Sequence, residues 1–353
     1  MPSLYCTTPH VGLAHILQFL QLHVFPQWLA AGVFTEIDTD PQEGVSATHK
    51  LILVDLSNPE PVIAPVGGVI CYWYFTPSAV LPTHTYQHLD HPHMGIASSG
   101  MLVGALLHSL PPSPAPALYT RVRLLRAVPL IAALPTYTPF SERRLGVSRE
   151  QLRSKRLGTA YGAKNYVLVV ADGLAEDPYG GQPEIVELIV RLKTALPDTL
   201  VVIESRNGGT TFDSTVLDAN ELRDGRDFVI FPNTAFDPDF YQLFDAAVGV
   251  TGSCYFPLSL VAAATCGIPT FAPDVHVWAE AITHMGAAPI PVTFFSKRGD
   301  SYGYGADIGA LATALGTQLQ NVNFGRRALA KTASGKALGA EANSSLLTLF
   351  GLI

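Results

Sequence analysis

The sequence has few charged residues. Only 14% of its 353 residues are Asp, Glu, Lys or Arg, against about a quarter in an average globular protein. Because 48% of the residues are apolar, the composition excludes a disordered or coiled-coil chain and predicts α/β layers with buried strands. The net charge of −7 argues against a broad nucleic-acid surface, since neutralising phosphates requires clustered Lys and Arg.

Cysteine pairs and long apolar runs are also absent. The four cysteines lie far apart with no CxxC pair, which argues against a zinc knuckle or a disulfide framework and favours a reducing, cytoplasmic setting. Residues 1–35 contain no charged side chain, but polar residues and Pro26 interrupt every apolar run well short of about 20 residues. No basic segment of the kind that begins a signal peptide precedes them. We expect a cytoplasmic protein with at most peripheral membrane contact.

Basic residues are concentrated in two segments, Arg121–Arg126 and Arg143–Arg156. They could face an anionic substrate or a lipid headgroup, or they could form a solvated helix face.

The second half of the chain alternates strands with helices. Spacings of this kind suit βαβ crossovers and a parallel sheet. The expected strands are 166–171, 200–204, 228–231, 246–250 and 269–272, and the expected helices are 183–196, 239–244 and one that ends near Gly267. Small residues in Gly158–Lys164 suggest a boundary between an N-terminal domain, 1–160, and a C-terminal domain, 161–353.

The first half is less regular. Strands are expected at Leu4–Thr7, Leu51–Leu56 and Gly68–Phe75, with a helix over Leu13–Ala31 that Gly32 closes. The segment from Pro77 to Pro116 is rich in His, Pro, Gly and Ser, and is interpreted as a long loop around one short helix.

The most informative pattern is a strand, a Gly-Ser turn and a helix. Ala246–Val250 is followed by Thr251, Gly252 and Ser253, and then by an apolar segment that ends at Gly267. Unpaired N–H groups at a helix start form an anion site suited to a diphosphate. An ordinary βαβ unit with turn-forming glycines is the alternative.

This stretch resembles the nucleotide-sugar half of GT-B glycosyltransferases, especially the UDP-glycosyltransferases and the peptidoglycan N-acetylglucosaminyltransferases. The resemblance extends from Tyr166 to the C-terminus and, faintly, over residues 1–35. The matching positions are Tyr241, Asp245, Gly267, Pro269 and Pro273. The resemblance implies two Rossmann-like domains facing across a cleft. The donor-binding residues that it implies are Gly173, Phe231, Asn233, Thr234, Thr251, Gly252, Ser253, Asp274 and His276.

Two positions depart from the family pattern. The family glutamate that holds the ribose hydroxyls corresponds to Ala262, and the acidic or amide pair that recognises the donor sugar corresponds to His276 and Val277. Alanine and valine side chains accept no hydrogen bonds, so the identity of the donor is left open.

The resemblance also implies a catalytic base near the end of the first strand. Histidine suits the removal of a proton from an acceptor hydroxyl, because its pKa lies near neutrality. His10 lies in the expected loop and His15 in the first helical turn. Burial of His15 against the sheet is the alternative for that residue.

A second group of candidates lies in the His-rich loop. Its members are His84, His88, Asp90, His91 and His93. Such residues could bind a transition metal, line the acceptor site or be ordinary exposed loop. The GT-B resemblance argues against a required metal, so no metal and no cofactor are expected.

The resulting expectation is an inverting, metal-independent glycosyltransferase whose donor is a nucleotide-sugar. The resemblance to UDP-glycosyltransferases suggests UDP, but the sequence defines neither the nucleotide and sugar of the donor nor the acceptor. A nucleotide-sugar epimerase of the same fold and a non-catalytic GT-B-like binding subunit are the two alternatives.

Overall fold

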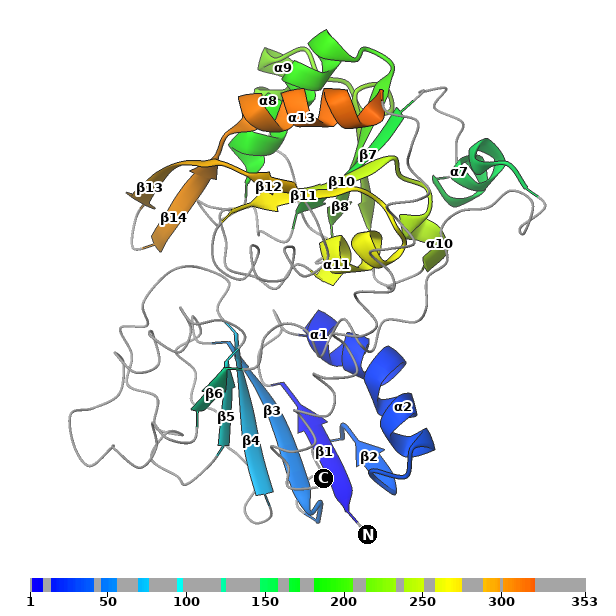
Figure 1. Cartoon of the computed structure of the whole chain (residues 1–353), viewed down its shortest axis with the longest axis vertical. Helices are drawn as coiled ribbons and strands as arrows, with labels where there is room; N and C mark the ends of the chain where they lie inside the picture. The colour runs from blue at the N-terminus through cyan, green and yellow to red at the C-terminus, as the bar shows by residue number, and fades with distance from the viewer. Residues whose placement is uncertain are drawn as a thin grey trace. The chain divides into compact units, whose positions relative to one another are not determined.

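The structure is a computed structural model of the whole chain, drawn in Figure 1. It describes residues 2–8, 14–40, 46–55, 69–75, 94–97, 122–124, 147–157, 165–171, 181–205, 214–232, 238–250, 258–274, 288–298 and 301–320. These residues fall into two compact units. The first takes in the described part of Met1–Pro135, and the second takes in that of Thr136–Ser253 and Pro257–Lys336.

The first unit contains a six-stranded sheet in which every neighbouring pair is parallel, in the order β2-β1-β3-β4-β5-β6. Apart from its last strand, this is the 2-1-3-4-5 order of flavodoxin-like folds. The strands are β1 (Ser3–Thr7), β2 (Glu36–Asp38), β3 (His49–Asp55), β4 (Val69–Phe75), β5 (Met94–Ala97) and β6 (Val122–Leu124).

The expected helix over residues 13–31 is present, but it contains a π-helical turn. It consists of α1 (Ala14–Phe19), the turn η2 (Leu20–Val24) and α2 (Phe25–Ala30). Pro26 lies in the first turn of α2. Its ring would clash with the carbonyl of Leu22 in a regular α-helix, and the wider π turn relieves that clash. Gly32 follows the helix with φ +68°, as expected of a glycine C-cap.

The prediction of a long loop from residue 77 to 116 was wrong at residues 94–97, because these residues form β5, which pairs with β4. A four-residue run of Met, Gly, Ile and Ala has weak strand propensity, and only pairing with neighbouring strands defines it. The short helix expected at 100–107 and the strand expected at 130–134 lie outside the described residues.

The second unit contains another six-stranded parallel sheet, in the order β12-β11-β10-β7-β8-β9. Counted from β7, this is the Rossmann order 3-2-1-4-5-6. The strands are β7 (Asn165–Ala171), β8 (Thr199–Ser205), β9 (Phe228–Pro232), β10 (Ala246–Gly249), β11 (Thr270–Pro273) and β12 (Ala288–Ile290). The five strands expected in this half are confirmed within two residues at each end.

Helices cover both faces of this sheet (Figure 1). α8 (Gln182–Ala195) and α13 (Ile308–Leu319) lie on one face, and α10 (Pro238–Tyr241) and α11 (Leu258–Thr265) lie on the other. The second unit also contains α7 (Arg149–Leu157), α9 (Ser214–Ala219) and an antiparallel hairpin of β13 (Val292–Arg298) and β14 (Ser301–Ala306).

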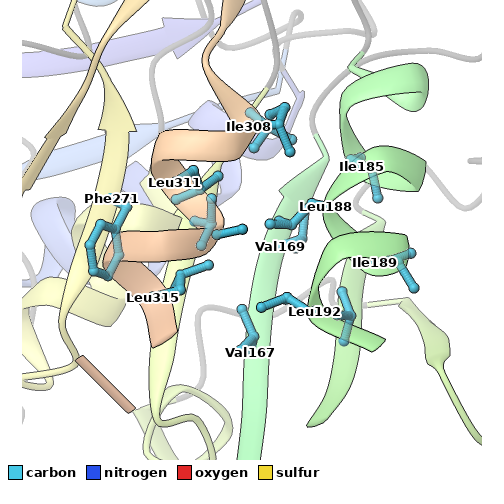
Figure 2. Close-up of a cluster of buried hydrophobic side chains, with 14 of the residues drawn as sticks. Val167, Val169, Ile185, Leu188, Ile189, Leu192, Phe271, Ile308, Leu311 and Leu315 are labelled. Atoms are coloured by element: carbon cyan, nitrogen blue, oxygen red, sulfur yellow. The ribbon is translucent and has the colours of Figure 1, made fainter. Parts of the chain in front are cut away.

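The main core lies between the sheet and the helices α8 and α13. Figure 2 shows Leu188 and Leu192 of α8 and Leu311 and Leu315 of α13 gathered around Val169 of β7. All five side chains are essentially buried. Alternate residues of β7 therefore belong to this core, and the residues between them face α10 and α11.

Candidate functional site

The donor-binding residues suggested by the sequence come, along the chain, near the ends of strands of the second sheet. Because neighbouring strands are parallel, β7, β8, β9, β10 and β11 all end at the same edge. In the sequence, candidate donor residues come at or near four of those ends: Gly173 comes two residues after β7, Phe231 is the penultimate residue of β9, Thr251 comes two residues after β10, and Asp274 directly follows β11. The fold therefore brings strand ends up to 102 residues apart, Ala171 of β7 and Pro273 of β11, to a common edge.

The strand order singles out one point on this edge. β7 lies beside β10 in the sheet. The strand that follows β7 along the chain, β8, lies on one side of this pair, and the strand that follows β10, β11, lies on the other. Ligands of doubly wound sheets bind outside the carboxyl ends of the strands at such a switch point. In the sequence, Gly173 comes two residues after the end of β7 and Gly252 three residues after the end of β10, the two strands at this point.

Only some of the candidate residues lie within the described part of the chain. Asp274 is exposed at the end of β11, and its N–H donates to the carbonyl of Ile290 at 2.9 Å. Phe231 is partly buried and stacks on Phe240 with ring centroids 5.0 Å apart. The other donor candidates, Gly173, Asn233, Thr234, Thr251, Gly252, Ser253 and His276, lie outside the described residues.

A strand before Gly252 and a helix after it are both present, whereas residues 251–257 between them lie outside the described residues, so a Gly-Ser turn that opens the helix stays a prediction. β10 ends at Gly249, and α11 begins at Leu258 and ends at Thr265. Ala262, which stands where the family has a glutamate, is fully buried in this helix. A ribose would therefore have to be recognised by other groups.

A buried polar cluster at this edge was not predicted. The Glu204 side chain, at the end of β8, is only 1% exposed. Its Oε1 accepts a hydrogen bond from the Ser259 hydroxyl at 2.8 Å and another from the Tyr241 hydroxyl at 3.2 Å, and the two hydroxyl oxygens are 3.0 Å apart. We call these three residues the Glu204 cluster. Its partners are 37 and 55 residues from Glu204, so no local sequence signal could have found it.

At the opposite edge, Asp245 forms an ion-pair cluster with helix α7. Its two oxygens accept from Arg149 and Arg153 at 2.7 Å each, and one also accepts from the backbone N–H of Tyr166 at 2.9 Å. The Arg153 guanidinium also lies 3.9 Å from the centroid of the Tyr166 ring and donates to the Leu243 carbonyl at 2.8 Å. Burial lowers the pKa of Arg153, while the charge of Asp245 opposes that shift.

These contacts fix α7 to the second unit. The structure therefore gives part of the basic segment Arg143–Arg156 a structural role, because Arg149 and Arg153 are paired within the fold. The expected domain boundary at residues 160–161 lies just after α7 and stays a prediction, whereas the compact units divide at Pro135.

The first sheet has a comparable switch point. β1 lies between β2 and β3, so the chain leaves its carboxyl end where the strand order reverses. His10 follows β1 within three residues and lies outside the described residues. His15 is the second residue of α1, where only its backbone is described. The choice between these two histidines stays open.

No group of three or more His, Cys, Asp or Glu side chains that could hold a metal occurs within the described ranges. The five residues of the His-rich loop, His84, His88, Asp90, His91 and His93, fall outside those ranges. Among the helices that are described, none is both long and apolar enough to cross a membrane.

Comparison with known proteins identifies the architecture. No family model matches the sequence, and no curated protein matches it. Among solved structures, the chain is similar to a glycosyltransferase from Rickettsia africae ESF-5, with a TM-score of 0.55 and 9% identity over 99% of this chain and 97% of that one. It is equally similar to Anabaena Alr3699/HepE in complex with UDP, with a TM-score of 0.55 and 12% identity over the full length of both chains.

A third similar structure is WaaG, a glycosyltransferase involved in lipopolysaccharide biosynthesis. Its TM-score is 0.54, with 9% identity over 99% of this chain and all of that one. At such identities the likeness shows the fold. The predicted class is confirmed: the chain has the GT-B fold of these glycosyltransferases, with two parallel α/β units.

Proposed function

We propose that this protein is a glycosyltransferase that moves a sugar from a uridine-diphosphate sugar to an acceptor hydroxyl. The observation that carries the proposal is the strand order of the two sheets. In the sequence, Gly252 and Ser253 come shortly after β10, one of the two strands at the switch point of the second sheet, and His10 comes shortly after β1, the switch strand of the first.

The solved structures similar to this chain support the choice of a uridine-diphosphate sugar as donor. Two of the solved structures that are similar along their full length are glycosyltransferases, and a third, HepE, is in complex with UDP. Backbone N–H groups at the start of α11 would bind the diphosphate, because a helix N-terminus carries a partial positive charge. Gly252 would let the diphosphate approach the backbone closely.

We propose an inverting displacement without a metal. The acceptor oxygen attacks the anomeric carbon and gives its proton to a histidine base, His10 or His15. The bond between that carbon and the diphosphate oxygen breaks, and the nucleoside diphosphate leaves with the electron pair. The helix start stabilises the charge that develops on the leaving group.

The donor site is tested by calorimetry. UDP should bind the wild type, and Gly252→Val should abolish binding because the added side chain occupies the path of the diphosphate. Gly316→Val is the matched control: a Cβ at Gly316 on α13 has no heavy atom within 4 Å. If UDP, GDP, ADP and dTDP all fail to bind the wild type, the donor-site proposal is wrong.

The reaction is tested by the release of free nucleotide. A transferase releases UDP at a substantial rate only with an acceptor, whereas an epimerase interconverts donor sugars without one. A protein that binds UDP but supports neither reaction would be a binding subunit. Turnover should also survive excess EDTA; loss of activity that zinc or manganese restores would instead implicate the loop from His84 to His93.

A further inference from the structure

The Glu204 cluster joins three chain segments next to the candidate donor edge. Glu204 is the penultimate residue of β8, Tyr241 is the last residue of α10, and Ser259 is the second residue of α11. Glu204 lies at the carboxyl end of β8, α10 follows β9 along the chain, and α11 follows β10, a strand at the switch point. One carboxylate oxygen thus connects the end of β8 with the helices that follow β9 and β10.

Stability alone does not explain a carboxylate at this position. Glu204 lies on the sheet face of Val202 and Val170, and those neighbours are fully buried. Removing a carboxyl group from water costs several kcal/mol, roughly, unless hydrogen bonds compensate, and an aliphatic side chain would continue the core without that cost. What the carboxylate adds is a directed acceptor that fixes two hydroxyls in one arrangement.

The arrangement bears most directly on α11. Ser259 is fully buried, and its hydroxyl is held at 2.8 Å from Glu204 Oε1. Tyr241 of α10 is also fully buried, and its hydroxyl hydrogen-bonds with both Glu204 Oε1 and the Ser259 hydroxyl. Its ring packs against Phe240, with ring centroids 5.4 Å apart. Because Ser259 lies in the first turn, the carboxylate sets the position of the N–H groups that open the helix.

We propose that Glu204 is a positioning residue for donor binding: through Ser259 and Tyr241 it holds the first turn of α11 where the donor diphosphate binds. Glu204 itself is buried and does not touch the donor. This inference rests on the proposed function, because it assumes a nucleoside diphosphate at the start of α11. On this inference, the affinity of the diphosphate site depends in part on Glu204, a residue that lies outside that site.

The test compares UDP affinity with folding stability in matched variants. Glu204→Ala should weaken UDP binding by about tenfold or more while the protein remains folded, since two hydrogen bonds that fix α11 are lost. Glu204→Gln keeps an oxygen acceptor and should recover most of the affinity that alanine loses. Ser259→Ala should weaken binding in the same direction, and adding it to Glu204→Ala should have little further effect.

Asp227→Ala provides the control for general destabilisation. Asp227 is the other buried carboxylate among the described residues, 7% exposed, but it precedes β9 at the opposite edge of the sheet. This variant should lower the unfolding temperature and leave the Kd for UDP unchanged. The proposal is overturned if folded Glu204→Ala binds UDP as the wild type does, or if Asp227→Ala weakens binding equally.

Hydrogen exchange separates this inference from the proposed function. In Glu204→Ala without ligand, the amides of Leu258–Leu260 should exchange faster than in the wild type, and those of α8 should not change. If the wild type binds no nucleotide but the exchange result holds, the proposed function fails and the positioning of α11 stands. If UDP binds and exchange in α11 is unaffected, the positioning role fails alone.

Discussion

The two edges of the second sheet use polar groups differently. At the amino edge, Asp245 and Asp227 pair with arginines: Asp245 with Arg149 and Arg153 of α7, and Asp227 with the adjacent Arg226 at 2.6 Å. At the carboxyl edge, the buried carboxylate of Glu204 accepts hydrogen bonds from hydroxyl groups. The Asp245 pairs join α7 to the sheet, whereas the Glu204 cluster joins β8 to α10 and α11.

From this difference we expect stability to depend on the amino edge and ligand binding on the carboxyl edge. Changes at the amino edge should alter the free energy of unfolding and leave ligand binding intact. Changes at the carboxyl edges of either sheet should alter binding or turnover. The predictions below test that separation, beginning with the largest effect.

The largest effect is expected at the carboxyl edge of the first sheet. His10→Ala should reduce turnover by about 10²–10⁴-fold, the usual contribution of a general base, and leave UDP affinity nearly unchanged. Steady-state kinetics and calorimetry measure the two quantities. His15→Ala is the comparison: if it alone abolishes turnover, the roles are exchanged, and if neither variant slows the reaction, the base lies elsewhere, with the loop from His84 to His93 next in order.

The next effect is expected at the amino edge. Asp245→Ala leaves two arginines without their carboxylate and removes the acceptor of the Tyr166 N–H, so the second unit should lose about 3 kcal/mol of unfolding free energy in urea. Arg156→Ala is the control. Its pair with Asp239 is 39% and 48% exposed, and the loss should stay below about 1 kcal/mol. Equal losses in both variants would show that the Asp245 cluster has no special role.

Two glycines of the second unit should respond in opposite directions to alanine. Gly267 follows α11 at the amino edge with φ +81°, where a side chain is strained, so Gly267→Ala should cost about 1 kcal/mol. Gly316 lies within α13, and a Cβ there meets no heavy atom within 4 Å. Gly316→Ala should therefore stabilise the protein by roughly 0.5–1 kcal/mol. Thermal unfolding measures both, and a stabilising Gly267→Ala would contradict the backbone geometry.

The smallest effect is confined to acid pH. Burial would raise the pKa of Asp227, but hydrogen bonds from Arg226 and from the N–H of Arg223, together with Lys193, hold it below the ordinary value of 3.8. The unfolded chain therefore binds this proton more readily than the folded one. The stabilisation is fully present above the ordinary pKa and is lost as pH falls through the lower folded pKa.

Asp227→Asn removes that proton-binding group, so its unfolding free energy should depend less steeply on pH below about 4 than that of the wild type. Urea unfolding between pH 2.5 and 7 gives the two curves. Parallel curves would show that Asp227 has the same pKa in both states.

The sequence predicted the second unit better than the first for a physical reason. Strands buried on both faces, such as β7 with Tyr-Val-Leu-Val-Val, form continuous apolar runs between turn residues. By contrast β2, β5 and β6 have three or four residues each, too few for any periodicity. They are strands because longer neighbours pair with them.

The sequence predicted which segments form the candidate site, but it did not predict the side-chain contacts beside that site. Parallel topology brings the ends of β7, β9, β10 and β11 together, so the order of the elements was enough to locate the edge. The Glu204 cluster could not be found in this way, because a carboxylate at a strand end is normally solvated. Only the packing of α10 and α11 over β8 buries it.

The parallel order of the second sheet has a consequence for synthesis on the ribosome. β7 is flanked by β8 and β10, and the Tyr166 N–H finds its carboxylate on Asp245, 79 residues later. At about 5–20 residues per second, that carboxylate emerges roughly 4–16 s after Tyr166. For this interval the edge of β7 that β10 later covers keeps its backbone N–H and C=O groups unpaired and open to other nascent chains, and we expect the translation speed between residues 171 and 246 to set how long this edge stays exposed.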